Sequence, residues 1–225
     1  MTRPFLDLVS TDEAKGLLAL GAEHRYASRA TLFHQGEPTH HVALLLSGWA
    51  KVSAQSRRGD EVLLAIRGPD DILGELSAID DRPRSATVTA LVPVCARIIP
   101  EQQFLQHLQA FPGAMFAMLQ HVTTRLRESD AERLRYVSTS SSGRVAALLL
   151  DLAERQGLCT PDGVVIDLPL TQQELAKAAA TSREVVARTL RMLRDRRLVR
   201  TSRQRIVLVQ VPVLRSLVDS MSDDA

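Results

Sequence analysis

The chain has 225 residues, 45% of them hydrophobic, and a formal net charge of +2, so it can form one or two domains that fold without disulfide or metal support. Its two cysteines, Cys95 and Cys159, form no CxxC pair, which argues against a structural zinc, an iron–sulfur cluster or a disulfide framework and fits a reducing compartment. The N-terminus lacks the apolar region of a signal peptide and the apolar runs are too short to span a bilayer, so we expect a cytoplasmic location and no membrane partner.

A short helix followed by a β-rich region is predicted for the first hundred residues. Ser10 and Glu13 have the spacing of a capping box, so a helix begins there. After Arg29, turn signals such as Gly36-Glu37-Pro38 and Ser47-Gly48 alternate with short apolar segments, which is typical of a barrel or sandwich. The segments that we expect to be strands include 42–46, 50–54, 62–66 and 86–91.

Three histidines after Arg29, namely His34, His40 and His41, raise the alternative of a metal site. Neighbours in a strand point to opposite faces, and no carboxylate or cysteine completes a ligand set at metal spacing. We therefore expect no metal.

The most specific motif occupies residues 73–88 and places a glycine, a carboxylate and an arginine around one short helical loop. Backbone N–H groups after Gly74 favour an anion, and Arg84 adds a planar fork of donors that matches phosphate oxygens. Glu75 can accept a hydrogen bond from a sugar hydroxyl. The motif therefore predicts that a phosphate and a ribose are held together; the alternative is a hairpin with a surface salt bridge.

A long helix is predicted over 115–137, about 34 Å in length. Apolar residues at steps of four, three and four form a coiled-coil seam, which indicates a dimer: Met115, Leu119, Val122 and Leu126, resumed by Leu134 and Val137. The alternative is a core helix packed on its own β domain, which Phe116 and Met118 favour for the first turns; both can hold at once. Ser129 and Asp130 interrupt the seam, so they either fix its register or meet a polar ligand.

The remaining third of the chain has the pattern of a hinge followed by a helix-turn-helix. Small polar residues at 137–143 predict the hinge, and the next helix covers 144–155. Two capping boxes, Thr171 to Glu174 and Thr181 to Glu184, predict helices to about 178 and 196 with a short turn between them. A hairpin over 198–209, broken at 202–204, adds a wing.

The second of these helices has one apolar and one basic face. Val186, Leu190 and Leu193 share a face, and the opposite face presents Arg183, Glu184, Ala187, Arg188 and Arg191. Basic residues dominate between 175 and 205, where a polyanion would dock. Double-stranded DNA is the expected partner; the alternative is an ordinary solvated arginine face.

These motifs together resemble the Crp/Fnr family of bacterial transcription regulators, and within it the cyclic-AMP receptor protein group, over residues 29–209. The resemblance rests on the 73–88 motif, which is similar to a phosphate-binding cassette, and on the sequences at 142–146, 161–163 and 182–188. It implies an α+β fold. The implied parts are a cyclic-nucleotide-binding β-roll, or double-stranded barrel, in 1–112, a dimerisation helix with a hinge in 113–139, and a winged helix-turn-helix in 140–225.

The resemblance also implies roles for single residues. Glu75 would bind the ribose 2′-hydroxyl, Arg84 and Ser85 the cyclic phosphate, and Ser129 with its neighbour the base. The residues expected at the nucleotide site are Gly74, Glu75, Leu76, Arg84, Ser85, Ala86, Ser129 and Asp130. Those expected at DNA are Thr171, Ser182, Arg183, Glu184 and Arg188, of which Arg183, Glu184 and Arg188 would read a TGTGA-like half-site.

Three features depart from the family pattern. The interval from Glu75 to Arg84 is one residue shorter than in the enterobacterial activator and equals that of eukaryotic kinase regulatory subunits. Asp130 stands where that activator has a hydroxyl residue, which leaves open whether the site prefers adenine over guanine. Ala180 replaces the usual glycine of the helix-turn-helix turn, so the turn should differ in geometry. The Fnr branch is disfavoured because its N-terminal cysteine cluster is missing.

The expected function is a transcription regulator that responds to a cyclic nucleotide, foremost cyclic AMP, and binds palindromic DNA as a homodimer, with RNA polymerase as a further partner. Alternatives are a regulator of the same family that takes cyclic GMP, another effector or none, and a cyclic-nucleotide-binding regulatory subunit without DNA activity. No nucleophile elbow, P-loop or metal-ligand helix occurs in the sequence, so we do not expect an enzyme.

Overall fold

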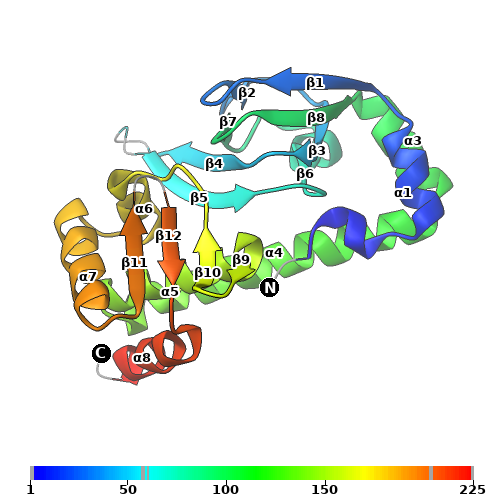
Figure 1. Ribbon diagram of the computed structural model, residues 1–225. Helices are drawn as coiled ribbons and strands as arrows, with labels where there is room; N and C mark the ends of the chain where they lie inside the picture. The colour runs from blue at the N-terminus through cyan, green and yellow to red at the C-terminus, as the bar shows by residue number, and fades with distance from the viewer. Residues whose placement is uncertain (1–2, 57–58, 60, 203–204, 224–225) are drawn as a thin grey trace. The chain divides into compact units, whose positions relative to one another are not determined.

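A computed structural model describes residues 3–56, 59, 61–202 and 205–223. Its contacts divide the chain into two compact units, Met1–Glu128 and Ser129–Ala225, which are described separately below. The fold is α+β: a β-rich N-terminal unit, a long helix and a C-terminal helical unit with a small sheet (Figure 1). The long helix, α4 (Pro112–Ser138), contributes to both units.

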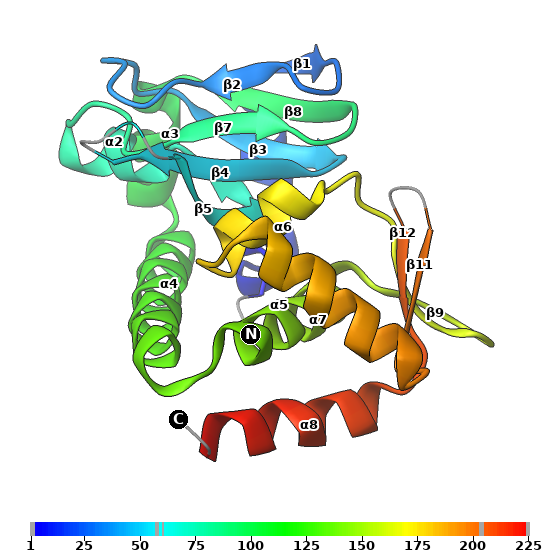
Figure 2. The ribbon, with the colours of Figure 1, turned by 90° about the vertical axis from the view of Figure 1, so that its left-hand side faces the viewer.

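The N-terminal unit is built on two four-stranded sheets of antiparallel pairs, which lie face to face (Figure 2). One sheet has the order β1-β8-β3-β6, formed by Ala22–Tyr26, Val94–Ile99, Val42–Ser47 and Ile72–Leu73. The other has the order β2-β7-β4-β5, formed by Thr31–Phe33, Thr87–Ala90, Ala50–Gln55 and Glu61–Arg67. Its helices are η1 (Phe5–Leu8), α1 (Thr11–Leu18), α2 (Glu75–Asp80), α3 (Glu101–Ala110) and the start of α4.

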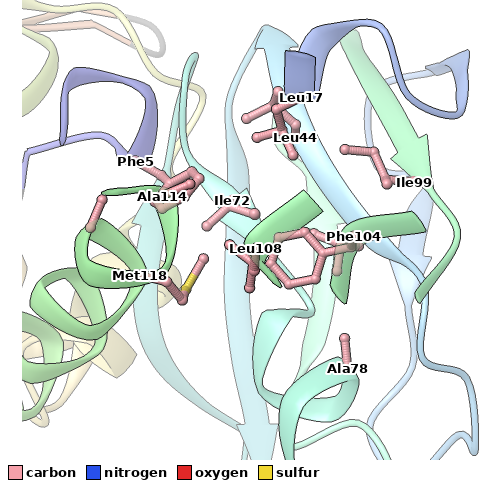
Figure 3. Packing of buried hydrophobic residues seen from close by; sticks show 12 residues of the cluster. Phe5, Leu17, Leu44, Ile72, Ala78, Ile99, Phe104, Leu108, Ala114 and Met118 are labelled. Atoms are coloured by element: carbon pink, nitrogen blue, oxygen red, sulfur yellow. The ribbon is translucent and has the colours of Figure 1, made fainter. Parts of the chain in front are cut away.

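Strand β3 is the centre of this unit because both of its faces are buried. Ala43 and Leu45 point into the core between the two sheets, whereas Val42 and Leu44 point into a second core beneath α1, α3 and α4. Figure 3 shows Phe104, Leu108 and Met118 among the side chains of this second core. A strand buried on both faces needs a continuous apolar run, and the sequence Val-Ala-Leu-Leu-Leu provides it.

The first turns of α4 pack on this second core through small residues. Ala114, Ala117 and Met118 are buried there, so the alternative of a core helix holds for these turns. Phe116, which the sequence also assigned to the core, is instead 60% exposed. Its position is two residues from Ala114 and thus about 200° around the helix, on the outer face.

The C-terminal unit contains α5 and a helix-turn-helix beside a four-stranded antiparallel sheet of order β11-β12-β10-β9. Its elements, in chain order, are α5 (Ser141–Gln156), β9 (Leu158–Thr160), β10 (Gly163–Ile166), α6 (Gln172–Ala178), α7 (Arg183–Asp195), β11 (Val199–Ser202), β12 (Arg205–Leu208) and α8 (Val211–Asp223). Buried residues of α5, α7 and α8, such as Leu149, Leu193 and Leu214, form its core.

Several predicted boundaries change in the structure. Helix α4 begins three residues before the predicted start, and the hinge reduces to Thr139 and Ser140, where Ser140 caps α5 by accepting from the N–H of Gly143. The N-cap of α7 is Ser182 and not Thr181, because the Ser182 hydroxyl accepts from the N–H of Val185. The hairpin predicted at 198–209 is present as β11 and β12, and its tip at 203–204 lies outside the described residues, as do the side chains of 135–137.

The helices within the described ranges include none that is long and apolar enough to cross a membrane.

Candidate functional site

Gly74 is the N-cap of the short helix α2 and has a left-handed conformation, with a φ of 81°. A Cβ atom at this position would lie 2.4 Å from Nη1 of Arg84 and 3.0 Å from the carbonyl oxygen of His41. Both the backbone angle and the close approach of the arginine therefore require glycine. The glycine and the arginine of the sequence motif, ten positions apart, are thus in direct contact.

The Arg84 guanidinium is held from three sides by the protein. Its Nε donates to Oγ1 of Thr39 at 2.9 Å, Nη1 to the carbonyl of Gly74 at 3.0 Å and Nη2 to the carbonyl of His41 at 2.6 Å. The group also lies 4.0 Å from the ring centroid of Phe33, which supplies a cation–π contact. These contacts fix the orientation of the fork before any ligand arrives.

This guanidinium is a buried cation without an anionic partner among the described residues. Arg84 is only 3% exposed, and none of the described carboxylates forms an ion pair with it. Burial lowers the pKa of Arg84, and the negative charges of Glu75 and Glu37 oppose that change, so the group stays protonated at neutral pH. Three of its five N–H groups donate to the described acceptors, which leaves two for a phosphate.

Glu75, the first residue of α2, is paired with an arginine that the sequence interpretation missed. Its Oε1 accepts from Nη1 of Arg125 on α4 at 2.5 Å, and Nη2 of Arg125 donates to the carbonyl of Ile72 at 3.0 Å. Glu75 is 2% exposed, so the ion pair is desolvated on the carboxylate side. Oε2 forms no hydrogen bond with the described residues and can accept one from a hydroxyl.

The pattern of α4 contained a signal for Arg125. Buried positions recur along the helix at Ala114, Met118 and His121, and Arg125 continues this stripe one turn later. A charged residue on an apolar stripe needs a partner, but the sequence alone could not say that the partner lies 50 residues earlier.

The other predicted nucleotide residues have different surroundings. Leu76 is 42% exposed and Ser85 is exposed, whereas Ala86 is buried. Ser129 and Asp130 follow in α4 within the C-terminal unit, where Asp130 pairs with Arg133 at 3.4 Å. A role of Ser129 and Asp130 toward a base stays a prediction.

The helix-turn-helix begins with a complete capping box. The Thr171 hydroxyl accepts from the N–H of Glu174, and the Glu174 carboxylate accepts from the N–H of Thr171. At the start of α7, Ser182 is the N-cap of the helix. A hydrogen bond from the Ser182 hydroxyl is also the main cause that lowers the pKa of the Glu184 carboxyl. Glu184 is therefore ionised at neutral pH and ready to accept hydrogen bonds.

Helix α7 presents its polar face to solvent as the sequence predicts. Val186, Leu190 and Leu193 are buried, and the exposed residues of the opposite face are Arg183, Glu184, Arg188 and Arg191. The wing is attached to this helix, because Nη1 of Arg194 donates to Oγ1 of Thr201 on β11 at 2.9 Å. The arrangement provides a helix with two forked donors and one acceptor in its first two turns.

Four of the predicted seam residues of α4 are exposed in the single chain, and the side chain of Val137 lies outside the described residues. Met115, Leu119, Leu126 and Leu134 are 45%, 62%, 61% and 71% exposed, whereas Val122 packs in part against the second core. Large apolar side chains in a row on one helix face are unusual at a protein surface that meets only water.

Comparison with known proteins yields matches to both units. Residues 23–111 match the cyclic nucleotide-binding domain, and residues 143–217 match the Crp-like helix-turn-helix domain. The chain is 30% identical over 187 residues, 82% of its length and 88% of the relative, to the cAMP-activated global transcriptional regulator CRP of Salmonella typhimurium. The chain belongs to the Crp/Fnr family of transcription regulators.

Further relatives agree with this assignment. The Crp/Fnr regulator described here is 32% identical over 160 residues to the CRP-like cAMP-activated global transcriptional regulator of Mycobacterium tuberculosis, with 71% of each chain covered. The solved structure of FixK2 from Bradyrhizobium japonicum has the same fold, with a TM-score of 0.78 at 18% identity, covering 88% of this chain and 97% of that one. The family is not enzymatic, in agreement with the sequence prediction.

Proposed function

We propose that this regulator binds cyclic AMP in its N-terminal unit and, as a homodimer, uses α7 to bind palindromic DNA more tightly when the nucleotide is present. The observation that carries the proposal is the Arg84 guanidinium, which is buried, oriented and without a carboxylate partner among the described residues. A cyclic phosphate supplies the missing negative charge. The buried Glu75 beside it supplies an acceptor for the ribose hydroxyl.

The choice of cyclic AMP rests on the relatives from Salmonella and Mycobacterium, whose names state activation by cAMP. Cyclic GMP is the second candidate because Asp130 stands at the position expected to meet the base. Its carboxylate can accept from both the N1–H and the exocyclic amino group of guanine, whereas adenine offers only an amino group beside an acceptor nitrogen. The phosphate and ribose contacts are common to both nucleotides, so only contacts with the base can distinguish cyclic AMP from cyclic GMP.

The homodimer is supported by the exposed apolar face of α4 described above. A second copy would cover it by the same coiled-coil seam on both chains. Two copies of α7 would then enter successive major grooves, about 34 Å apart. DNA and RNA polymerase are the partners that we propose for this transcription regulator, and a cytoplasmic location is part of the same proposal.

Calorimetry of the purified protein with cyclic AMP, cyclic GMP and cyclic di-GMP tests the ligand directly. We expect binding of cyclic AMP that Arg84→Leu abolishes and that Arg82→Leu retains. Arg82 loses the same charge two positions away, but it is exposed. Equal binding by both variants would refute the assignment of the phosphate to Arg84.

A DNA titration with and without cyclic AMP tests the switch. The duplex is the palindrome that the wild-type protein selects from a randomised pool. We expect cyclic AMP to raise the affinity about 5- to 150-fold, which corresponds to a coupling of about 1–3 kcal/mol, and Arg84→Leu to lose this response while keeping its affinity for random DNA. Equal affinity in both conditions would mean that the cassette is no switch for this nucleotide.

A further inference from the structure

Arg144, in the first turn of α5, connects the end of α4 to the turn of the helix-turn-helix. On one side, Nη1 donates to the carbonyl of Thr139 at 2.8 Å and Nη2 to Oγ of Ser141 at 3.1 Å. On the other side, Nε donates to the carbonyl of Ala179 and Nη2 to the carbonyl of Ala180, each at 3.0 Å. One guanidinium thus joins the backbone at Thr139 to the backbone at Ala179 and Ala180.

The turn that Arg144 contacts is strained. Ala180 has a φ of 44°, in the left-handed region that glycine adopts freely and that is unfavourable for alanine because its Cβ approaches the backbone. The N–H of Thr181 donates to the carbonyl of Ala176 at 2.9 Å, which closes the turn around this residue. The carbonyls of Ala179 and Ala180 follow the end of α6, and two nitrogens of the arginine satisfy both of them.

The attachment at the other end is also tight. Thr139 is 5% exposed, and a Cβ on Gly143 would lie 2.7 Å from its methyl group, so the glycine lets the Thr139 side chain pack on α5. A second polar contact joins α5 to α7 nearby, where the hydroxyl of the buried Thr189 donates to Oγ of Ser142 at 3.1 Å. The first turn of α5 therefore contacts both the hinge and α7.

We infer that Arg144 is a positioning residue for DNA reading: it holds the Ala180 turn in its left-handed conformation and makes the angle of α7 depend on the backbone at Thr139. The inference rests on the proposed function of α7. A lysine could not replace the arginine, because one ammonium nitrogen cannot reach acceptors on both sides as the three guanidinium nitrogens do. The position of Ala180 makes the arginine necessary, since a glycine there would hold the turn without help.

The experiment uses the full-length protein and three variants, Arg144→Lys, Ala180→Gly and the double variant. Lysine keeps the positive charge, so the affinity for random DNA should stay within about twofold. The ratio of affinities for the selected palindrome and random DNA should fall at least about tenfold in Arg144→Lys. The ratio should remain as in the wild type in Ala180→Gly, and most of it should return in the double variant. A role in stability alone would not give this recovery in DNA discrimination.

Amide hydrogen exchange of the same proteins supplies a readout that needs no DNA. We expect faster exchange at 176–184 and 139–143 in Arg144→Lys, and recovery at 176–184 alone in the double variant. The inference would be overturned, and the proposed function left intact, by one result. In it, Arg144→Lys has the same exchange rates and the same affinity ratio as a wild type that prefers the palindrome over random DNA. A wild type that selects no palindrome would overturn both. Arg183→Ala, measured in parallel, shows what loss of a base contact does without a change of the turn.

Discussion

The buried imidazole of His121 should make the N-terminal unit sensitive to acid. The side chain is fully buried on α4, and neither ring nitrogen has a hydrogen-bond partner in the described structure. Burial, with the nearby positive charges of Arg125 and Arg67, lowers the pKa of His121 from 6.5 to about 3. The folded protein therefore keeps this imidazole neutral at pH values where the unfolded chain protonates it.

The direction and size of the effect follow from this difference in proton uptake. Below pH 6.5 the unfolded chain binds a proton that the folded chain does not bind until about pH 3, so the free energy of unfolding falls as the pH falls through that window. The slope approaches about 1.4 kcal/mol per pH unit, and the loss between pH 7.5 and pH 5 is about 2 kcal/mol. Above pH 7.5 the contribution is constant.

Urea unfolding followed by tryptophan fluorescence measures this change. Trp49 is the single tryptophan and lies in the N-terminal unit, so its signal reports that unit. His121→Leu should have similar stability to the wild type at pH 7.5, because no hydrogen bond is lost, and should lose about 2 kcal/mol less at pH 5. His34→Leu removes an exposed histidine and should keep the wild-type slope. Identical pH slopes for the wild type and His121→Leu would refute the reasoning.

Three further predictions concern the sites. Gly74→Ala should lower the affinity for cyclic AMP at least about tenfold in calorimetry, because the new Cβ displaces Arg84; Gly59→Ala, with a similar positive φ and open space around it, should leave the affinity unchanged. Leu126→Glu should stay folded, since the side chain is exposed in the single chain, but should sediment as a monomer; an unchanged dimer mass would mean that the seam is misplaced. Arg183→Ala should cost about 1–3 kcal/mol on the selected palindrome and relax the preference at one base pair, whereas equal losses on random DNA would count against base reading.

The parts of the fold that sequence predicted are those with strong local signals. The capping boxes at Ser10 and Thr171 both form as expected, because cap and partner are three residues apart. Helix α3 was missed because four of its first six residues are glutamine or glutamate, which gives no apolar periodicity, and its buried positions, Phe104, His107 and Leu108, are few. Strand β9 was missed for a similar reason, since all three of its residues are exposed.

The candidate nucleotide site was predictable in part for the same physical reason. Gly74, Glu75 and Arg84 lie within one loop, so their spacing carries the prediction. Thr39 and Arg125 join them from positions 45 and 41 residues away from Arg84, and only tertiary packing brings them together. Sequence spacing carries no information on such contacts. The charge of Arg125 on an apolar stripe of α4 indicates only that this residue needs a partner.

The contact between Gly74 and Arg84 also constrains how the protein can evolve. A side chain at position 74 would meet the guanidinium at 2.4 Å, so it cannot arise before the arginine has been replaced by a smaller residue, and the left-handed φ of 81° still disfavours it afterwards. The reverse order is open, because loss of the arginine leaves the glycine turn intact. In a lineage that no longer binds the nucleotide, we therefore expect Arg84 to be replaced before Gly74. In such a lineage, a glycine without its arginine would mark a receptor that has only recently lost its signal.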